Sequence, residues 1–404
     1  MGILLRLRRL IEADRAFPWK FAYIGTQALE AAAMSTKLGG NRLYDLQRFG
    51  QSTWLECMHP RLLAGAQFVH LVKDGISGVD ADSAGFATAY AEDLTYGKAV
   101  STLRAAGATA QQIYEHLSID DLRSAADRLR PVNRYSGNRD GYVSIDLSPA
   151  LAYDADATQS EARRLWSLID RPNVMIKVPA TDTGLIAIRR LIAAGINVNA
   201  TFIFGTRRHR QVADAYVMGL EDRAAERLRL EGIVSVASIS VRRIDAAVDR
   251  ELDAIQRPEK AARINHLRGN AAIAVAQFAY QGYKSMIASA RWQPLAASHA
   301  QPQRLLWTSA DSGQACDSDL KYVNRLIGRD TISSMSLTTA DAYRDHGTAA
   351  PTVERNLLEV LAQLGDLETV GINLDRVSSQ LERESIGATA AGVNTAFTRL
   401  ASAA

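Results

Sequence analysis

Eight short runs of β-strand character alternate with longer segments of helical character from about residue 49 onward. Several of the runs are continuously apolar rather than alternating, which is typical of strands in a parallel sheet whose outer face is covered. The runs are QSTWLE (51–56), ISGVDAD (76–82), YVSIDL (142–147), VMIKV (174–178), NVNATFIF (197–204), VSVASIS (234–240), RLLWTSA (304–310) and DTISSM (330–335).

Two of the connections between these runs carry legible helix signals. In TQSEARRLWSLIDRP, Thr158 and Glu161 form a capping box and Pro172 ends the apolar periodicity. In TGLIAIRRLIAAGIN, Gly195 supplies the C-cap. Only about 20 residues separate VMIKV from NVNATFIF, which leaves room for one crossover helix and makes these two strands parallel.

Eight such units favour a (β/α)8 TIM barrel. The alternative is a doubly wound open sheet, which is weakened because no GxGxxG follows the first strand. Residues 84–140 and 241–303 are expected to form helical insertions, and residues 350–404 two or three closing helices. We therefore expect an N-terminal extension at 1–45, flexible or helical, followed by the barrel at 46–404.

Composition narrows the function classes. The chain has 404 residues, of which 47% are hydrophobic and 23% charged. Its net charge of +3 is too small to indicate a nucleic-acid-binding protein. The two cysteines, Cys57 and Cys316, have no CxxC spacing, so no structural zinc site is expected. They are too few for a disulfide framework, which fits a protein of the reducing cytoplasm.

The N-terminus shows no secretory signal, because basic residues interrupt its apolar stretch. Residues 1–33 are either an amphipathic extension or an over-long gene start, since MSTKLGG at Met34 would suit the start of the compact part. No apolar run reaches the roughly 18 residues of a transmembrane helix, so no membrane association is expected. No P-loop or dinucleotide fingerprint is present, so no cofactor is implied.

Polar residues in the predicted strands mark the candidate site. Catalytic groups of a (β/α)8 barrel come from the carboxyl ends of its strands. The runs offer a ring of acids, amides and hydroxyls around one amine: Glu56, Asp80, Asp82, Asp146, Lys177, Asn199, Thr201, Ser238, Ser309 and Asp311.

Lys177 is the most informative residue of this ring, because it stands where a buried strand would carry another valine. A lysine at a strand end commonly extends to water. Here Asp146 on the preceding strand, and Asn199 and Thr201 on the following one, are available as partners. We expect desolvation to lower the pKa of Lys177 and to make its free amine a nucleophile toward a carbonyl.

Five stretches together resemble the transaldolase family, in particular its bacterial branch with longer chains. They are YVSIDLSPALAYDADATQSEARRLW, RPNVMIKVPAT, GINVNATFIFG, VASISVRRIDAAVD and IGRDTISSMSLTTADAYRDHG, and the resemblance covers about residues 49–348. It implies a (β/α)8 barrel and a metal-independent Schiff-base mechanism of carbohydrate metabolism, in the pentose phosphate pathway. A three-carbon dihydroxyacetone unit passes from a ketose phosphate to an aldose phosphate while bound to the lysine.

The resemblance also implies roles for individual residues. The Schiff-base lysine matches Lys177, and the glutamate and threonine that handle water fall on Asp146 and Thr201. The aspartate that removes the C4 hydroxyl proton falls on Glu56. The substrate-binding positions, of which the last binds phosphate, are Asp82, Asn199, Ser238 and Arg243.

Besides the exchange of aspartate for glutamate at Glu56 and of glutamate for aspartate at Asp146, this chain departs from the family at two places. Its second strand has DADS at 80–83 where the family reads roughly Thr-Ser-Asn-Pro, so an asparagine that would touch donor hydroxyls is replaced by a carboxylate. After the seventh strand it has DSG at 311–313 where the branch carries Ser-Thr-Lys. Phosphate recognition relies on charge-assisted donors, and added carboxylates would repel a dianion.

Three readings follow. The first is a transaldolase acting on sugar phosphates, with Arg242 beside Arg243 replacing the missing cation. The second is a Schiff-base aldolase or transaldolase for an unphosphorylated or amino sugar in a biosynthetic pathway, because an acidic site favours a cationic ligand. The third is a non-catalytic barrel that acts as a binding protein. A small sugar substrate and a monomer or homodimer are expected in the enzymatic readings.

Overall fold

The computed structural model describes residues 41–255, 261–309 and 318–402. The chain divides into two units, 1–41 and 42–404. Most of the predicted N-terminal extension therefore lies outside the described residues. The predicted boundary at residue 45 falls inside helix α3 (Leu43–Arg48), in which Leu43 and Leu46 are fully buried.

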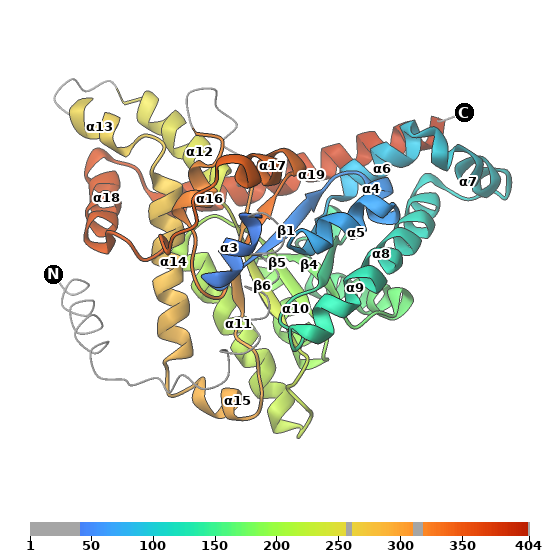
Figure 1. Cartoon of the computed structure of the whole chain (residues 1–404), viewed down its shortest axis with the longest axis horizontal. Coiled ribbons are helices and arrows are strands. Elements are labelled where there is room, and N and C mark those ends of the chain that lie inside the picture. Colours follow the sequence, from blue (N-terminus) through green and yellow to red (C-terminus); the bar gives the residue numbers. More distant parts are fainter. Residues whose placement is uncertain (1–40, 256–260, 310–317, 403–404) are drawn as a thin grey trace. The chain divides into compact units, whose positions relative to one another are not determined.

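Eight parallel strands close into a barrel in the order of the sequence, and helices surround it (Figure 1). The strands are β1 (Gln51–Cys57), β2 (Ile76–Ala81), β3 (Tyr142–Asp146), β4 (Val174–Pro179), β5 (Val198–Ile203), β6 (Ser235–Ser240), β7 (Arg304–Thr308) and β8 (Thr331–Met335). Every strand falls on one of the eight predicted apolar runs. The predicted (β/α)8 barrel is confirmed, and the closed β1–β8 contact rules out the open sheet.

The barrel interior has a core of its own, separate from the larger core between strands and helices. It consists of Trp54, Tyr142, Met175, Val234, Val236, Leu306 and Ile332, all buried. A Cβ at Gly78 would lie 2.4 Å from the indole Nε1 of Trp54, so β2 needs glycine where the large ring crosses it. This apolar layer fills the barrel interior below its carboxyl end, where catalytic groups of such barrels lie.

Helices occupy the predicted connections and insertions. They are α4 (Pro60–Ala64), α5 (Ala66–Lys73), α6 (Ser83–Glu92), α7 (Leu94–Ala105), α8 (Ala110–Tyr135), the 3-10 turn η1 (Pro149–Leu151), α9 (Ala155–Ile169), α10 (Asp182–Ala193), α11 (Thr206–Ala225), α12 (Val241–Asp253), α13 (Ala261–Leu267), α14 (Ala271–Ile287), α15 (Gln293–Ala297), α16 (Lys321–Arg325), α17 (Leu337–His346), α18 (Leu357–Val370) and α19 (Leu374–Ser402). The helical insertions and the closing helices α18 and α19 are confirmed. None of the helices described is long and apolar enough to cross a membrane.

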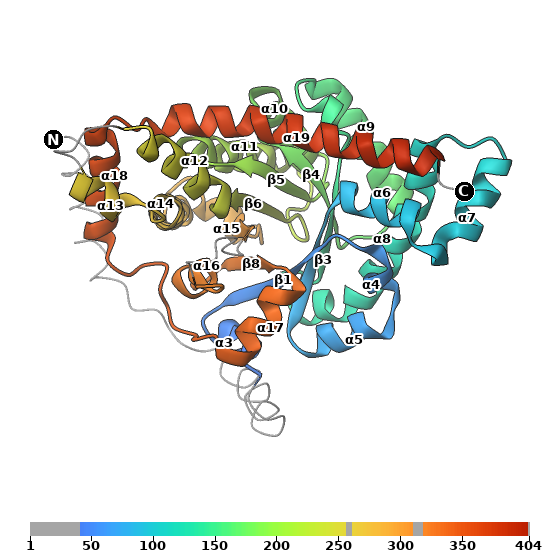
Figure 2. The same ribbon diagram turned by 90° about the horizontal axis from the view of Figure 1, so that it is seen from above.

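The last helix, α19, packs on the side of the barrel where the chain leaves β5. It contacts α6, α12 and β5, and Figure 2 shows it running past β5 and β4 to α6. Gly205, which follows β5, faces Ser378 of α19, because a Cβ there would lie 3.1 Å from the Ser378 hydroxyl oxygen. Helix α19 therefore borders the carboxyl end of the barrel, where the site is expected.

One helix start differs from the prediction. Helix α9 begins at Ala155, with Asp154 as its N-cap accepting hydrogen bonds from the backbone N–H groups of Asp156 and Ala157. The predicted capping box of Thr158 and Glu161 is wrong, because Thr158 already lies in the first turn and its hydroxyl donates to the carbonyl of Leu151 at 2.8 Å. The predicted C-cap is confirmed: α10 ends at Ala193, and Gly195 has φ +84°.

Candidate functional site

Lys177 lies on β4 and reaches into the carboxyl end of the barrel. Its run VMIKVP forms a strand that is buried along nearly its whole length, and Lys177 itself is only 7% exposed. The sheet register pairs Lys177 with Asp146 on β3 and with Asn199 on β5. The strand therefore places one amine among polar groups of its two neighbours, as predicted.

Three acceptors surround the Lys177 amine. Its Nζ lies 2.6 Å from Oδ1 of Asp80 on β2 and 3.4 Å from Oδ1 of Asp146. It also donates to the backbone carbonyl of Ala81. An ammonium group can donate three hydrogen bonds, so it is suited to a position among three acceptors.

The protonation state of this amine differs from the prediction. Burial acts to lower the pKa of Lys177, but the carboxylates of Asp146 and Asp80 outweigh it and raise the pKa above its ordinary value. The expectation of a lowered pKa is therefore wrong for the protein without substrate. The resting residue is a charged ammonium, and it must lose a proton before it can attack a carbonyl.

Asp146 is held in place by the start of α6. Its Oδ2 accepts hydrogen bonds of 3.1 Å from both the backbone N–H and the hydroxyl of Ser83, while Oδ1 faces Lys177. Burial raises the pKa of Asp146, Lys177 opposes that shift, and the nearby carboxylates of Asp82 and Asp80 add to it. A carboxyl group with a raised pKa next to an amine is suited to proton transfer near neutral pH.

The two acids of β2 have different surroundings. Asp82 follows the strand and is the N-cap of α6, where its Oδ1 accepts from the backbone N–H of Gly85 at 2.5 Å. Asp80, two residues earlier, is the one that contacts Lys177, and it is 8% exposed. The sequence placed both acids at the barrel mouth but gave a site role only to Asp82, whose contact with substrate stays a prediction.

A chain of hydrogen bonds leads across the barrel to Asp80. The Ser238 hydroxyl donates to Oδ1 of Asn199 at 2.6 Å, and the Asn199 amide donates to the Ser144 hydroxyl oxygen at 3.4 Å. The Ser144 hydroxyl then donates to Oδ1 of Asp80 at 2.9 Å. Ser144 was not predicted, although its position two residues before Asp146 puts both side chains on the same face of β3.

Thr201 lies two residues beyond Asn199 on β5, at an irregular point of the strand. The register between β5 and β6 shifts between Ala200 and Ile203, and Phe202 has φ +58°. Such a conformation costs a residue other than glycine on the order of 1–3 kcal/mol and is concentrated at functional sites. Thr201 is partly exposed at this bend, and its role in water handling stays a prediction.

Glu56 and Arg243 complete the predicted set. Glu56 is partly exposed near the end of β1 and pairs in the register with Asp80. Arg243 is exposed in the first turn of α12, directly after β6. Residues 311–313, where the chain departs from the family after β7, lie outside the described residues. The structure thus gives the positions of Glu56 and Arg243 but does not test their roles.

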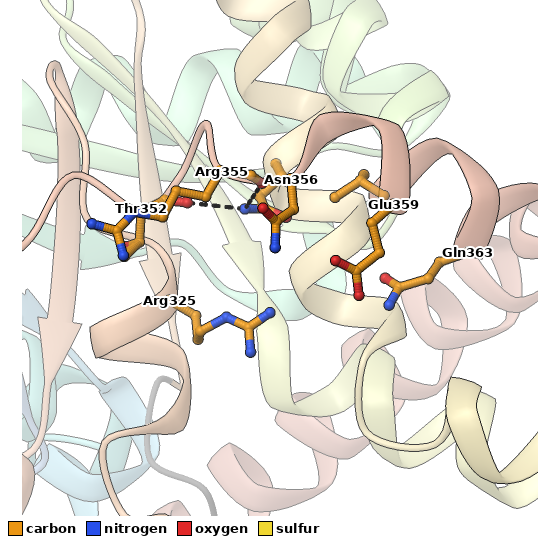
Figure 3. A pocket seen from close by; sticks show the side chains of 8 residues that line it. Arg325, Thr352, Arg355, Asn356, Glu359 and Gln363 are labelled. Atoms are coloured by element: carbon orange, nitrogen blue, oxygen red, sulfur yellow. Dashed lines mark hydrogen bonds between the residues drawn. The ribbon is translucent and has the colours of Figure 1, made fainter.

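Two further observations concern other kinds of site. Within the described part of the chain, no group of three or more His, Cys, Asp or Glu side chains is arranged to hold a metal ion. A hollow of about 300 Å³ lies at α14, α16 and the start of α18, where the Arg325 side chain and the helix residues Glu359 and Gln363 face it (Figure 3). None of the residues that line it belongs to the predicted site.

Fold and site together define an enzyme of the (β/α)8 class with a buried lysine among carboxylates at the barrel mouth. The family model described as transaldolase/fructose-6-phosphate aldolase matches residues 64–400. The chain therefore belongs to the transaldolase/fructose-6-phosphate aldolase family, which confirms the predicted resemblance. The match begins after β1, so Glu56 lies outside it.

Named relatives agree with this assignment. The chain is 42% identical to a transaldolase of Thiobacillus denitrificans over 339 residues, which are 84% of this chain and 93% of the relative. It is 39% identical to transaldolase 2 of a Nostoc species, over 83% of this chain and 90% of the relative. It is also 39% identical to transaldolase 1 of Streptomyces coelicolor, over 83% and 88%. The prediction of a transaldolase-type enzyme is confirmed.

Proposed function

We propose that the protein transfers a three-carbon ketol unit from a ketose phosphate to an aldose phosphate through a Schiff base on Lys177. The single observation that carries this proposal is the Lys177 amine, buried at the barrel mouth and in contact with two carboxylates. A buried lysine next to acids that can move its protons is what imine formation with a ketone needs. Family membership and the names of the relatives support the same reaction.

In this proposal the amine attacks the ketone carbon, and the resulting carbinolamine loses water to form the iminium. Asp146 and Thr201 handle the proton transfers of the water step. Glu56 removes the C4 hydroxyl proton, the C3–C4 bond breaks, and the aldose product leaves. The enamine that stays on Lys177 adds to the aldehyde carbon of the acceptor, and hydrolysis releases the new ketose and the free amine.

The substrate is held by polar groups of neighbouring elements. Asn199 and Ser238 are completely or almost completely buried and hydrogen-bonded to each other, so their orientation is fixed before a donor enters. They are assigned to the donor hydroxyls together with Asp82. Arg243, exposed at the start of α12, is assigned to the phosphate group.

The two other readings are not favoured. The relatives are named transaldolases, which gives no support to a non-catalytic binding protein or to an altered substrate. A cytoplasmic location and a monomeric or homodimeric state remain part of this proposal.

A donor comparison tests the proposed substrate class. The protein is assayed for ketol transfer with fructose 6-phosphate, with fructose and with an amino sugar as donors, each with an aldose phosphate acceptor. Fructose 6-phosphate is expected to have the highest kcat/KM, and Arg243→Ala is expected to raise KM for that donor but not for fructose. A preference for fructose or the amino sugar in the unmodified protein would contradict a phosphorylated donor.

A further inference from the structure

Two carboxylates face the Lys177 amine, and their geometry differs. Oδ1 of Asp80 lies 2.6 Å from Nζ, and its side chain is 10% exposed. Oδ1 of Asp146 lies 3.4 Å from Nζ, and its side chain is 26% exposed. Direct proton transfer requires heavy atoms about 2.6–3.2 Å apart, so only Asp80 lies within reach of the ammonium proton.

A chain of hydrogen bonds fixes the orientation of Asp80. The hydrogen bonds from Ser238 to Asn199, from Asn199 to Ser144 and from Ser144 to Asp80 all run in the same direction. Each donor in such a chain strengthens the next, and the chain ends on Oδ1 of Asp80, the same oxygen atom that faces the Lys177 amine. Asp146 has a different attachment, because both hydrogen bonds from Ser83 reach its Oδ2.

We propose that Asp80 is the catalytic base that takes the proton of the resting Lys177 ammonium when the donor ketone enters, which leaves Asp146 for the water step. This inference rests on the proposed function. It assigns a catalytic role to a residue that the sequence placed at the barrel mouth without a role of its own. Two neighbouring carboxylates with different surroundings would thus serve two different proton transfers.

The step balances in atoms and charge. A proton moves from Nζ to Oδ1 of Asp80, and the freed lone pair of Nζ forms a bond to the ketone carbon. The carbonyl electron pair moves to oxygen, which receives a proton from the new ammonium centre. The proton held by Asp80 is returned, by way of Asp146, to the departing hydroxyl. One ammonium and one ketone give one iminium and one water, and both carboxylates end as they began.

The charged neighbours of the amine decide what a substitution does. Asp80 comes from β2, Asp82 from the turn after it and Asp146 from β3, whereas β5 contributes the uncharged Asn199. Replacing Asp80 by asparagine removes the nearest of these three negative charges and keeps the shape and the hydrogen bond from Ser144. The ammonium of Lys177 is then less stabilised and loses its proton at a lower pH.

The rate at which fructose 6-phosphate and cyanoborohydride label the protein, measured across pH, tests this assignment. In Asp80→Asn the acid limb is expected to move down by about one pH unit or more, and the maximal rate to fall about 100-fold. If Asp80 were only a counterion of Lys177, Asp80→Asn would move the acid limb but leave the maximal labelling rate unchanged. A maximal rate within about threefold of the parent, or an unmoved acid limb, would overturn the proposal.

Two further variants keep the outcome decisive. Asp80→Glu retains the charge and is expected to label about tenfold faster than Asp80→Asn, with its acid limb at the parent position. If Asp80→Asn does not fold, Asp80→Glu decides, since a rate equal to the parent would count against a positioned base. Asp222→Asn, on the surface and paired with Arg189, is the matched control with no expected change. Labelling of Lys177→Ala would instead refute the proposed function itself.

Discussion

The Ser238 hydroxyl donates a 2.6 Å hydrogen bond to the side-chain oxygen of Asn199, and both residues are buried at the carboxyl end of the barrel. This bond fixes which end of the Asn199 amide is the donor. The NH2 group then points toward Ser144 and donates a hydrogen bond to its hydroxyl oxygen. The Ser144 hydroxyl in turn donates to Asp80, which contacts Lys177. A single hydroxyl on β6 thus orients the Asn199 amide, which we propose to contact the donor substrate.

Ser238→Ala is expected to affect both stability and donor binding. Removal of the hydroxyl leaves the buried Asn199 oxygen without that donor, which costs about 1–3 kcal/mol of unfolding free energy. The amide is then free to flip, so KM for the donor is expected to rise. Urea denaturation and steady-state kinetics measure the two effects.

Ser235→Ala on the same strand is the matched control. Ser235 donates to the Val198 carbonyl at 2.8 Å, but it lies at the amino-terminal end of β6, away from the mouth. Ser235→Ala should lower the free energy of unfolding and leave KM for the donor unchanged. Equal effects of the two substitutions on KM would contradict a binding role for Ser238.

Buried His209 predicts a loss of stability in mild acid. It lies on α11, and its Nδ1 has no hydrogen-bond partner among the residues that the structure describes. Burial, with a smaller contribution from Arg210, lowers the pKa of His209 from 6.5 to about 4. The folded pKa is below the unfolded one, so the neutral form stabilises the fold above pH 6.5, and that stabilisation is lost as pH falls toward 4. Between pH 7 and pH 5 the loss from this residue is about 2 kcal/mol.

Urea denaturation at pH 7 and pH 5 measures this effect. His209→Gln should remove that part of the pH dependence, whereas His116→Gln, at an exposed position, should leave it in place. A parent and a His209→Gln protein with equal pH dependence would contradict the assignment.

Gly184 is expected to be required where α10 starts after the strand of Lys177. A Cβ at this position would lie 1.9 Å from the backbone oxygen of Pro179, and the Gly184 N–H donates to the N-cap Thr181 at 2.9 Å. Gly184→Ala must push α10 away from the end of β4, so we expect destabilisation of about 1–3 kcal/mol or more and a lower kcat.

Gly97→Ala provides the comparison for a helical glycine without neighbours. Gly97 lies in α7, and no heavy atom lies within 4 Å of a Cβ built there. This substitution should raise the unfolding free energy by about 0.5–1 kcal/mol. Thermal unfolding of both variants checks the pair, and similar behaviour of the two would contradict the close approach at Gly184.

The strands were predictable because burial on both sides makes several of them continuous apolar runs, separated by segments of helical pattern. For the same reason Lys177 stood out, as the single charge in VMIKV. Helix starts were less predictable, since several residues compete to cap the same turn. Asp154 and Thr158 could each cap the start of α9. The path of the chain after η1 places Asp154 at the N-cap position.

Details of the site depended on distances that a sequence does not contain. Asp80 and Asp82 are two residues apart, so the sequence does not tell which of them contacts the Lys177 amine. In the structure β2 ends at Ala81, Asp82 is the N-cap of α6, and Asp80 contacts the amine. The pKa of Lys177 has the same origin. Burial lowers this pKa, the carboxylates of Asp146 and Asp80 raise it, and the carboxylates outweigh burial because the fold brings both close to Nζ.

The most direct measurement is covalent trapping on Lys177. The protein is incubated with fructose 6-phosphate and borohydride, digested, and mapped by mass spectrometry, with Lys177→Ala as the control. One reduced dihydroxyacetone unit is expected on the peptide that contains Lys177, and none on the variant. Labelling at another lysine, or an active enzyme whose Lys177 stays unmodified, would contradict the Schiff-base mechanism.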